Sequence, residues 1–417
     1  MSISRLGTAN MYDRTINNIN RQQNELASQM EHTSAGMRVI RPSDDPVAAA
    51  QAERARNRLE RIASDQRGLD AQKATIEYAE STLGEINDAL QEFRSLLVQA
   101  GNGAYNQVQR DTLVEQLTSL REQISKYANR TDSNGLPLFR GLDTQSGMPF
   151  PSDQALIQSG QANSGEFFIA NTLDGVHAFF DGRTGNGVLE VHLNPANQGK
   201  AHADVGAIQD PARAAALTPP PPAAVVPATI TFSTDPATGA MGYEVDDLTA
   251  TPAGLGPWTP YKSEDSIEVA GMAVVIKGEP VAGDSFSVEP SKTISVFDAL
   301  DRAIDTVRNN SNPDGSTAFG TLAHGLSKSL AELDTALNRN STVRGLAGDL
   351  LTQAQRMGNT LLVREEQTQA QRVAAEDYDA EGMVRAIAQM QTQQTAVSTA
   401  LQSYASIQKL SLFNYIN

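Results

Sequence analysis

The sequence predicts a mainly α-helical protein with a β insertion: a long, coiled-coil-like helical bundle formed from both chain ends, plus a central all-β domain. Apolar residues recur at heptad spacing in the first third of the chain, and the same spacing returns from about residue 296 to the end. Residues 141–290, by contrast, are rich in Gly, Pro, Asp and Thr and contain short alternating apolar runs. Helices from both ends are therefore expected to enclose the β insertion.

Residues 1–40 are predicted to form an N-terminal assembly helix. Its apolar seam steps by four and three residues from Tyr12 to Met37, which is typical of a coiled coil. Gln23 and Thr33 interrupt this seam, and polar residues at such positions weaken a coiled coil while fixing its register. The seam residues proposed for contacts with a partner are Ile16, Ile19, Leu26 and Met30.

An interhelical break is predicted at the run Arg41, Pro42, Ser43, Asp44, Asp45, Pro46. Pro46 suits the first turn of a helix, because its φ is fixed and it lacks the N–H that would be unpaired there. Either aspartate can accept hydrogen bonds from the free N–H groups of that turn. The second helix is therefore expected to begin near Val47.

Residues 41–140 are predicted to form the N-terminal part of the bundle. Its long helix has apolar residues seven apart, and it needs a partner helix of similar length because it cannot cover its own apolar stripe. A third helix follows the loop Ala100–Asn106 and ends at the turn Thr131–Phe139, where Asn134-Gly135 provides a positive φ. The heptad positions are Ile62, Leu69, Ile76, Leu83, Leu90 and Leu97.

Residues 141–290 are predicted to form the central β domain. Alternating runs at 166–169, 188–191, 229–232 and 266–269 indicate strands, and dipeptides such as Asp174-Gly175 indicate turns between them.

The C-terminal part of the bundle is predicted at residues 291–375, and a C-terminal assembly helix at 376–417. A leucine stripe from Leu322 to Leu361 marks the former, and four-three steps interrupted by Gln394 mark the latter. The proposed seam residues of the second assembly helix are Met383, Ile387, Met390, Val397, Leu401, Tyr404, Leu410 and Leu412.

The terminal segments fit two structural interpretations. Their seams are rich in Asn, Gln, Ser and Thr, so each is a marginal coiled coil that can order when neighbouring subunits bury its second face. An ordinary coiled coil within one chain fits the same pattern equally well.

Composition favours no catalytic or nucleic-acid-binding role. The 33 Lys and Arg against 49 Asp and Glu give a formal charge of −16, whereas a nucleic-acid binder needs a basic face. The chain has no Cys, and its five His show no metal-binding spacing and are interpreted as surface or loop residues. Gly182-x-x-Gly185-x-Gly187 lacks the GK[ST] ending of a phosphate loop, so it is interpreted as tight turns. No enzyme activity, cofactor or metal is therefore expected.

No segment of the sequence has the length and apolar character of a cleavable signal or of a membrane span. We therefore expect no membrane insertion.

The two ends of the chain resemble the flagellin superfamily of bacterial flagellar proteins. The likeness covers roughly residues 1–140 and 295–417, and its most shared element is the break GMRVIRPSDDP at 36–46. The turn TDSNGLPLF and the tail LQSYASIQKLSLFNYIN resemble the corresponding family segments. The resemblance implies a structural subunit of the bacterial flagellum that assembles through its terminal helices and supports motility.

The resemblance also implies partners and a route out of the cell. The implied partners are hook-associated protein 1, flagellin, and further copies of the chain in a ring or a short zone of helical lattice. A cytoplasmic export chaperone is expected to hold the C-terminal helix, and export is expected through the flagellar type III channel without a cleaved signal. The implied location is the extracellular flagellum, at the hook–filament junction.

Short terminal motifs distinguish the branches of this family. The opening ISRLGTANMYDR and the ending SLFNYIN are more similar to hook–filament junction proteins than to flagellins. A flagellin, the bulk filament subunit, is the first alternative. A surface adhesin that binds through the β domain is the second.

Overall fold

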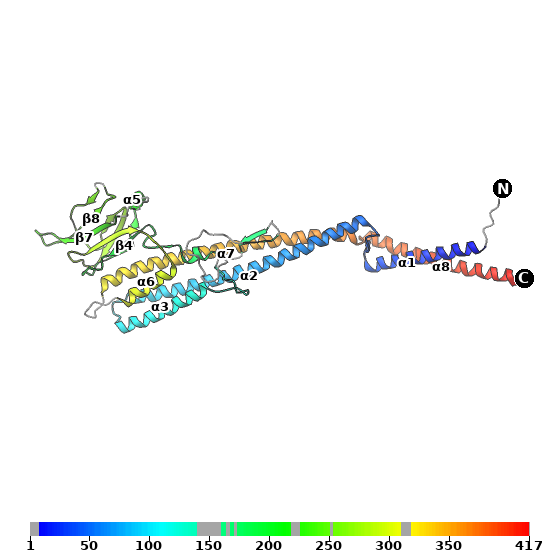
Figure 1. The fold of residues 1–417 in the computed structure, drawn as a ribbon, viewed down its shortest axis with the longest axis horizontal. Coiled ribbons are helices and arrows are strands. Elements are labelled where there is room, and N and C mark those ends of the chain that lie inside the picture. The colour runs from blue at the N-terminus through cyan, green and yellow to red at the C-terminus, as the bar shows by residue number, and fades with distance from the viewer. Residues whose placement is uncertain are drawn as a thin grey trace. The chain divides into compact units, whose positions relative to one another are not determined.

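The computed structural model describes residues 8–139, 160–163, 167–170, 173–217, 226–250, 253–309 and 318–416. The chain divides into two compact units (Figure 1). Unit 1 consists of residues up to 69 and from 356 onward, and unit 2 of residues 70–355. Helices α2 (Pro46–Ala100) and α7 (Phe319–Glu376) contribute to both units.

The predicted fold class is confirmed: helices from both chain ends flank a central region of short strands. The central region also contains two short helices, α4 and α5, so it is not entirely β. The remaining helices are α1 (Thr8–Ala35), α3 (Gln107–Ala128), α4 (Gly175–Phe179), α5 (Pro211–Ala216), α6 (Val296–Arg308) and α8 (Ala380–Ile416). The strands are β1 (Gly160–Asn163), β2 (Phe167–Ala170), β3 (Gly182–Arg183), β4 (Leu189–Leu193), β5 (His202–Ala203), β6 (Ala207–Ile208), β7 (Ala228–Thr234), β8 (Met241–Asp247), β9 (Gly254–Leu255), β10 (Thr259–Pro260), β11 (Ser266–Val269), β12 (Met272–Lys277), β13 (Ser285–Pro290) and β14 (Thr293–Ile294).

The partner that α2 needs for its apolar stripe is α7, and the two helices run antiparallel. In unit 2, Arg94 Nε lies 2.7 Å from Asp334 Oδ1, and the Asn340 amide donates to the Leu83 carbonyl at 2.9 Å. In unit 1, Gln66 Nε2 donates to Glu365 at 2.9 Å. As the residue number rises along α2, it falls along α7, as antiparallel packing requires.

The bundle core of unit 2 consists of the heptad residues of α2 together with α3. Phe93, Leu97, Leu117 and Ile124 are each fully buried. Burying each such side chain stabilises the fold by about 1.5–3 kcal/mol, which a single isolated helix cannot gain. After α3, the turn at Asn134-Gly135 forms as the sequence predicts, with φ of +78° at Gly135.

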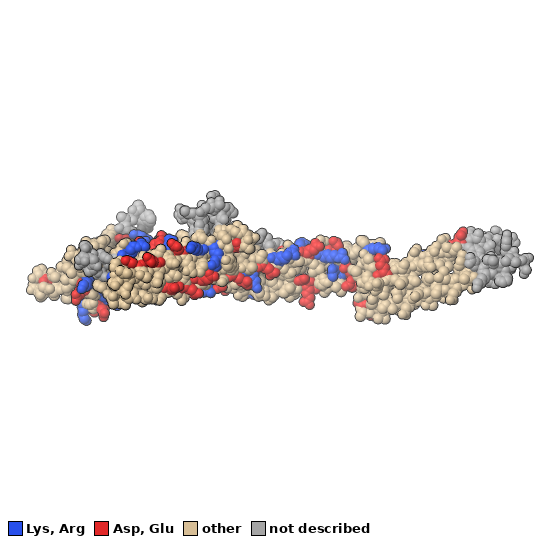
Figure 2. Space-filling view, turned by 90° about the horizontal axis from the view of Figure 1, so that it is seen from below, with Lys and Arg blue, Asp and Glu red and all other residues tan. Residues whose placement is uncertain are grey.

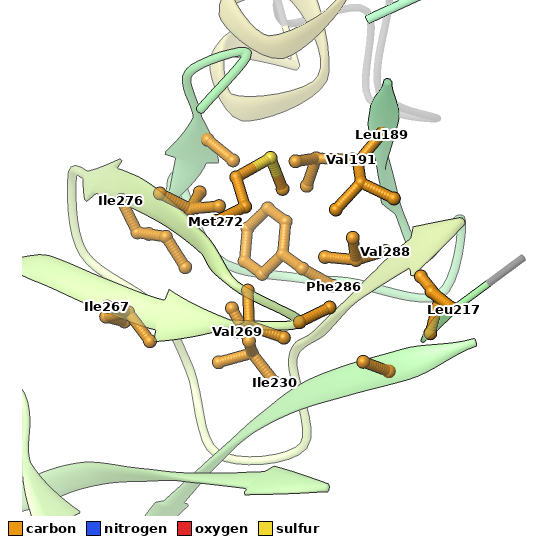
Figure 3. Close-up of a cluster of buried hydrophobic side chains, with 14 of the residues drawn as sticks. Leu189, Val191, Leu217, Ile230, Ile267, Val269, Met272, Ile276, Phe286 and Val288 are labelled. Carbon is orange, nitrogen blue, oxygen red and sulfur yellow. The ribbon is translucent and has the colours of Figure 1, made fainter. Parts of the chain in front are cut away.

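The β domain contains two main antiparallel sheets. One has the strand order β10-β8-β7-β13-β4 with β9 paired to β8, and the other has the order β11-β12-β5 with β6 paired to β12. Apolar side chains from both sheets meet in one buried cluster, with Phe286 of β13 near its middle and Met272 of β12 beside it (Figure 3). The predicted runs at 166–169, 188–191, 229–232 and 266–269 correspond to β2, β4, β7 and β11.

Two positions differ from the sequence-based expectations. Met37 lies beyond α1, because Gly36 adopts a φ of +72° that ends the helical path, so Met37 does not continue the seam. His324 is not a surface or loop residue: it lies on α7 and is buried against the β domain. The Gly182–Gly187 segment does form tight turns, with positive φ at Gly185 and Gly187.

Candidate assembly interface

The interhelical break is a compact, hydrogen-bonded turn between α1 and α2. Asp44 Oδ2 accepts hydrogen bonds from the backbone amides of Ile40 at 3.1 Å and Arg41 at 2.8 Å. Asp45 Oδ1 accepts from the amides of Val47 at 3.1 Å and Ala48 at 3.0 Å, so Asp45 caps α2. The two adjacent carboxylates therefore serve different helices' ends, and both are used within the turn.

These hydrogen bonds favour the ionised carboxylates. The backbone amide of Arg41, donating to Asp44, holds the pKa of that carboxyl below its ordinary value. The backbone amide of Ala48, followed by the Arg38 side chain, lowers the pKa of Asp45 in the same way. Both groups are charged at neutral pH, as the capping role requires.

The break is joined to the turn between α7 and α8 by backbone hydrogen bonds. The amides of Arg38 and Val39 donate to the Glu376 carbonyl at 2.7 and 3.1 Å, and the Tyr378 amide donates to the Gly36 carbonyl at 3.1 Å. Arg38 also donates from Nη2 to the Ala375 carbonyl at 3.0 Å. Segments from the two ends of the chain are thus fixed to each other at the base of the terminal helices.

A buried charge strengthens this joint. The Glu376 side chain is almost fully buried and forms an ion pair with Arg56 of α2. Arg38 is paired with Asp45 at 3.0 Å, so it links the α2 cap with the end of α7. Glu376 and Arg56 were missed by the sequence reasoning, because the two residues are distant in the chain and neither stands in a recognisable motif.

The terminal helices α1 and α8 pack antiparallel against each other, with both chain ends at the same end of the pair (Figure 1). Ile19 of α1 and Val397 and Ala386 of α8 are buried, and Gln29 Nε2 lies 3.5 Å from the Ala386 carbonyl. Of the proposed seam residues, Leu26, Met383, Met390 and Tyr404 are half-buried, whereas Ile16, Met30, Ile387 and Leu401 are exposed. The side chains of Leu410 and Leu412 lie outside the described residues.

The terminal pair leaves apolar side chains on its surface. Met30 is 55% exposed, Leu401 43% and Val384 67%. Residues 386–408 contain no Lys, Arg, Asp or Glu, and Figure 2 shows this part of the molecule as an almost uniformly uncharged surface. An uncharged helical surface with exposed aliphatic side chains is suited to burial against another helix.

A groove of about 590 Å³ lies beside the α7–α8 turn, between the break and α8. Arg38 and Arg385 line it, and each is already paired within the chain, Arg38 with Asp45 and Arg385 with Glu381 at 3.0 Å. Its lining residues include no nucleophile paired with a base. The groove therefore offers a polar surface for a polypeptide and no set of reacting groups.

Across the described ranges, no group of three or more His, Asp or Glu side chains is arranged to hold a metal ion. Within the same part of the chain, no helix has the length and apolar character needed to cross a bilayer.

Residues 6–144 match the family model of the bacterial flagellin N-terminal helical region. The chain is 34% identical over 186 residues to flagellar hook-associated protein 3 of Salmonella typhimurium, covering 43% of this chain and 55% of that protein. It is 27% identical over 302 residues to flagellar hook-associated protein 3 of Escherichia coli K12, covering 70% of this chain and 91% of that protein. The alignment thus spans about half the length of the Salmonella relative and most of the E. coli relative.

Flagellins are similar over a shorter stretch. Phase 1 flagellin of Salmonella naestved is 30% identical over 152 residues, which cover 36% of this chain and 28% of that flagellin.

Solved structures show the same fold. The hook-associated protein 3 of Legionella pneumophila is 26% identical with a TM-score of 0.63, covering 76% of this chain and 98% of that chain. A second structure, the flagellar junction protein of the same organism, has a TM-score of 0.63 at 24% identity and covers 78% of this chain and 100% of that chain.

Proposed function

We propose, from the premise that this chain is a homologue of flagellar hook-associated protein 3 with a flagellin-type N-terminal region, that it is a structural subunit of the bacterial flagellum. In this role it is the adaptor at the hook–filament junction, where it supports filament growth and motility. The observation that carries the proposal is the terminal pair of α1 and α8, whose surface is uncharged from residue 386 to 408 and retains exposed aliphatic side chains.

A pair of helices buries only one face of each helix. Ile19 and Val397 lie inside the pair, whereas Met30, Ile387 and Leu401 keep much of their surface in water. Neighbouring copies that cover these side chains would stabilise the pair, since burying each aliphatic side chain contributes about 1.5–3 kcal/mol when complete. Both interpretations of the terminal segments then hold together: α1 and α8 pair within the chain, and the pair is completed by its neighbours.

The parts of the chain have separate roles in this proposal. Residues 1–40 and 376–417 assemble, residues 41–140 and 291–375 form the bundle that supports them, and residues 141–290 form an additional β domain. The neighbours are hook-associated protein 1 on one side, flagellin on the other, and further copies of the chain in a ring or short zone of helical lattice. A cytoplasmic chaperone holds the C-terminal helix before export through the flagellar channel. The role needs no cofactor and no catalysis.

A junction subunit is favoured over a flagellin by the extent of similarity. The alignment with hook-associated protein 3 of E. coli covers 91% of that relative, whereas the alignment with phase 1 flagellin covers 28% of the flagellin. Purified chain that polymerises alone into long filaments would contradict this choice, because a junction subunit occupies a single short zone.

Deletion of residues 383–417 tests the proposal. We expect the truncated chain to be absent from isolated hook–filament complexes, because α8 loses nearly all of its length. Unit 2 should stay folded, since its core lies between residues 70 and 355, and circular dichroism on the purified protein checks this. Incorporation of the truncated chain at the wild-type level would show that the terminal pair is not the assembly element.

A further inference from the structure

Helix α7 covers the place where the two sheets of the β domain end side by side. Strands β4 and β5 are terminal strands of their sheets, and both leave backbone carbonyls facing α7. His324 of α7 occupies this seam: its Nδ1 lies 3.2 Å from the Ala203 carbonyl of β5, and its Nε2 lies 3.2 Å from the Val191 carbonyl of β4. The seam is therefore a closed sheet edge whose cover is a helix.

Two further ionisable residues follow His324 at helical spacing on the same face of α7. Lys328 forms an ion pair with Glu190 of β4, which is almost fully buried. Glu332, one turn further on, is only 3% exposed, and its carboxylate lies 3.6 Å from the Arg302 guanidinium of α6. Lys328 is thus flanked by two buried carboxyl groups, one on a strand and one on its own helix.

The two carboxyl groups have unequal partners. Burial opposes ionisation of Glu190, but hydrogen bonds from Lys328 and Thr184 outweigh it, and the pKa of Glu190 is lowered. Neither oxygen of Glu332 has a hydrogen-bond partner among the described residues. Burial raises the pKa of Glu332 to about 7, against the attraction of Lys328 and Arg302 and with added repulsion from Glu190.

We propose that Lys328 is the shared element of a proton-operated latch between α7 and the β domain. When Glu332 is protonated, the Lys328 ammonium holds β4 through Glu190. When Glu332 ionises, it competes with Glu190 for the same ammonium, and the seam along β4 and β5 loosens. The latch is separate from the terminal pair and does not depend on the proposed function.

The direction of the pH effect follows from the groups that face the seam. The folded-state pKa of Glu332 is raised, so its contribution is complete below its ordinary value of 4.5 and is lost as pH rises through about 7. Burial lowers the pKa of His324 and of His192, which lies near Glu190 and Glu289, so their contributions are present above 6.5 and are lost at acidic pH. The seam is therefore most firmly closed near neutral pH and opens on the alkaline side through Glu332.

Amide hydrogen exchange of the full chain at pH 7 and pH 9, corrected for the intrinsic exchange rate, measures this opening. We expect the protection factors of β4 and β5 to fall about tenfold or more between the two pH values, while α3 changes much less. Glu332→Gln should abolish the fall. Glu366→Gln, which changes an exposed glutamate on the same helix, should behave as wild type.

Three results would overturn the latch: no fall in the wild type, an unchanged fall in Glu332→Gln, or an equal fall in every part of unit 2. The last result would mean a general loss of stability and no specific opening of the seam. Glu332→Leu, which removes the titrating group from the buried site, provides the same comparison if the glutamine variant does not fold. Lys328→Met should lower the protection of β4 at pH 7 toward the wild-type value at pH 9.

Discussion

Replacing two exposed aliphatic residues of α8 by serine separates the folding of the chain from its assembly. Ile387 and Leu401 are 37% and 43% exposed in the isolated chain. If neighbouring copies cover α8, the substitutions remove apolar area that is buried only in the assembled state. The double variant Ile387→Ser/Leu401→Ser should therefore assemble poorly while folding normally.

The size of the effect follows from the exposed fractions. Complete burial of an Ile or Leu side chain contributes about 1.5–3 kcal/mol, so covering the remaining two-fifths contributes about 1 kcal/mol per residue. Two residues give about 2 kcal/mol, which corresponds to a roughly 30-fold weaker association. The unfolding free energy of the monomer should change by no more than about 0.5 kcal/mol per site, as for other exposed positions.

The assay compares the amount of each variant in hook–filament complexes isolated from complemented cells. The matched control is Val98→Ser/Leu346→Ser, which changes residues of α2 and α7 in unit 2 that are 53% and 45% exposed. We expect the control to be incorporated at the wild-type level. Thermal unfolding followed by circular dichroism checks that both variants are folded.

Equal incorporation of the α8 variant and the control would refute the reasoning. It would mean that the exposed aliphatic side chains of the terminal pair are not covered by neighbours. A lower melting temperature of the α8 variant alone would refute it in another way, since the residues would then contribute to the fold of the monomer.

Two further outcomes test the internal structure. Phe93→Ala should lower the unfolding free energy of the chain by about 3–5 kcal/mol in urea titrations, because Phe93 is fully buried between helices, whereas Val98→Ala at an exposed site should change it by less than about 0.5 kcal/mol. Asp45→Asn should lower the melting temperature at pH 7, and the difference from wild type should disappear at acidic pH. The pKa of Asp45 is lowered in the folded chain, so the contribution of its charge is present above the ordinary value of 3.8 and is lost as pH falls through the folded-state pKa; a difference that persists at pH 2 would contradict this.

The local features of the break could be predicted from the sequence because their physics is local. Pro46 at the first turn and Asp45 as the cap act over two or three residues, and the structure has both. The contact of the break with Glu376 could not be predicted, because it joins segments that are more than 300 residues apart. Met37 was placed in the seam by its spacing alone, and the positive φ of Gly36 moves it to the joint with Asp377.

Periodicity identified the seams of the terminal helices but not which face each helix buries. Ile19 and Val397 are buried in the pair, yet Ile16 and Leu401 belong to the same repeats and are exposed. A heptad pattern states which residues share a stripe, and only the partner's position determines which of them are covered. His324 illustrates the same limit, since nothing in the sequence near it shows that the edges of two sheets meet over α7.

Cells that lack this chain give the most direct test of the central claim, that it joins hook to filament. We predict completed hooks without filaments in electron micrographs, and unpolymerised flagellin in the culture medium, because the first filament subunits have no surface on which to assemble. Reintroducing the full chain should restore filaments. Filaments of normal length on cells without the chain would contradict the account.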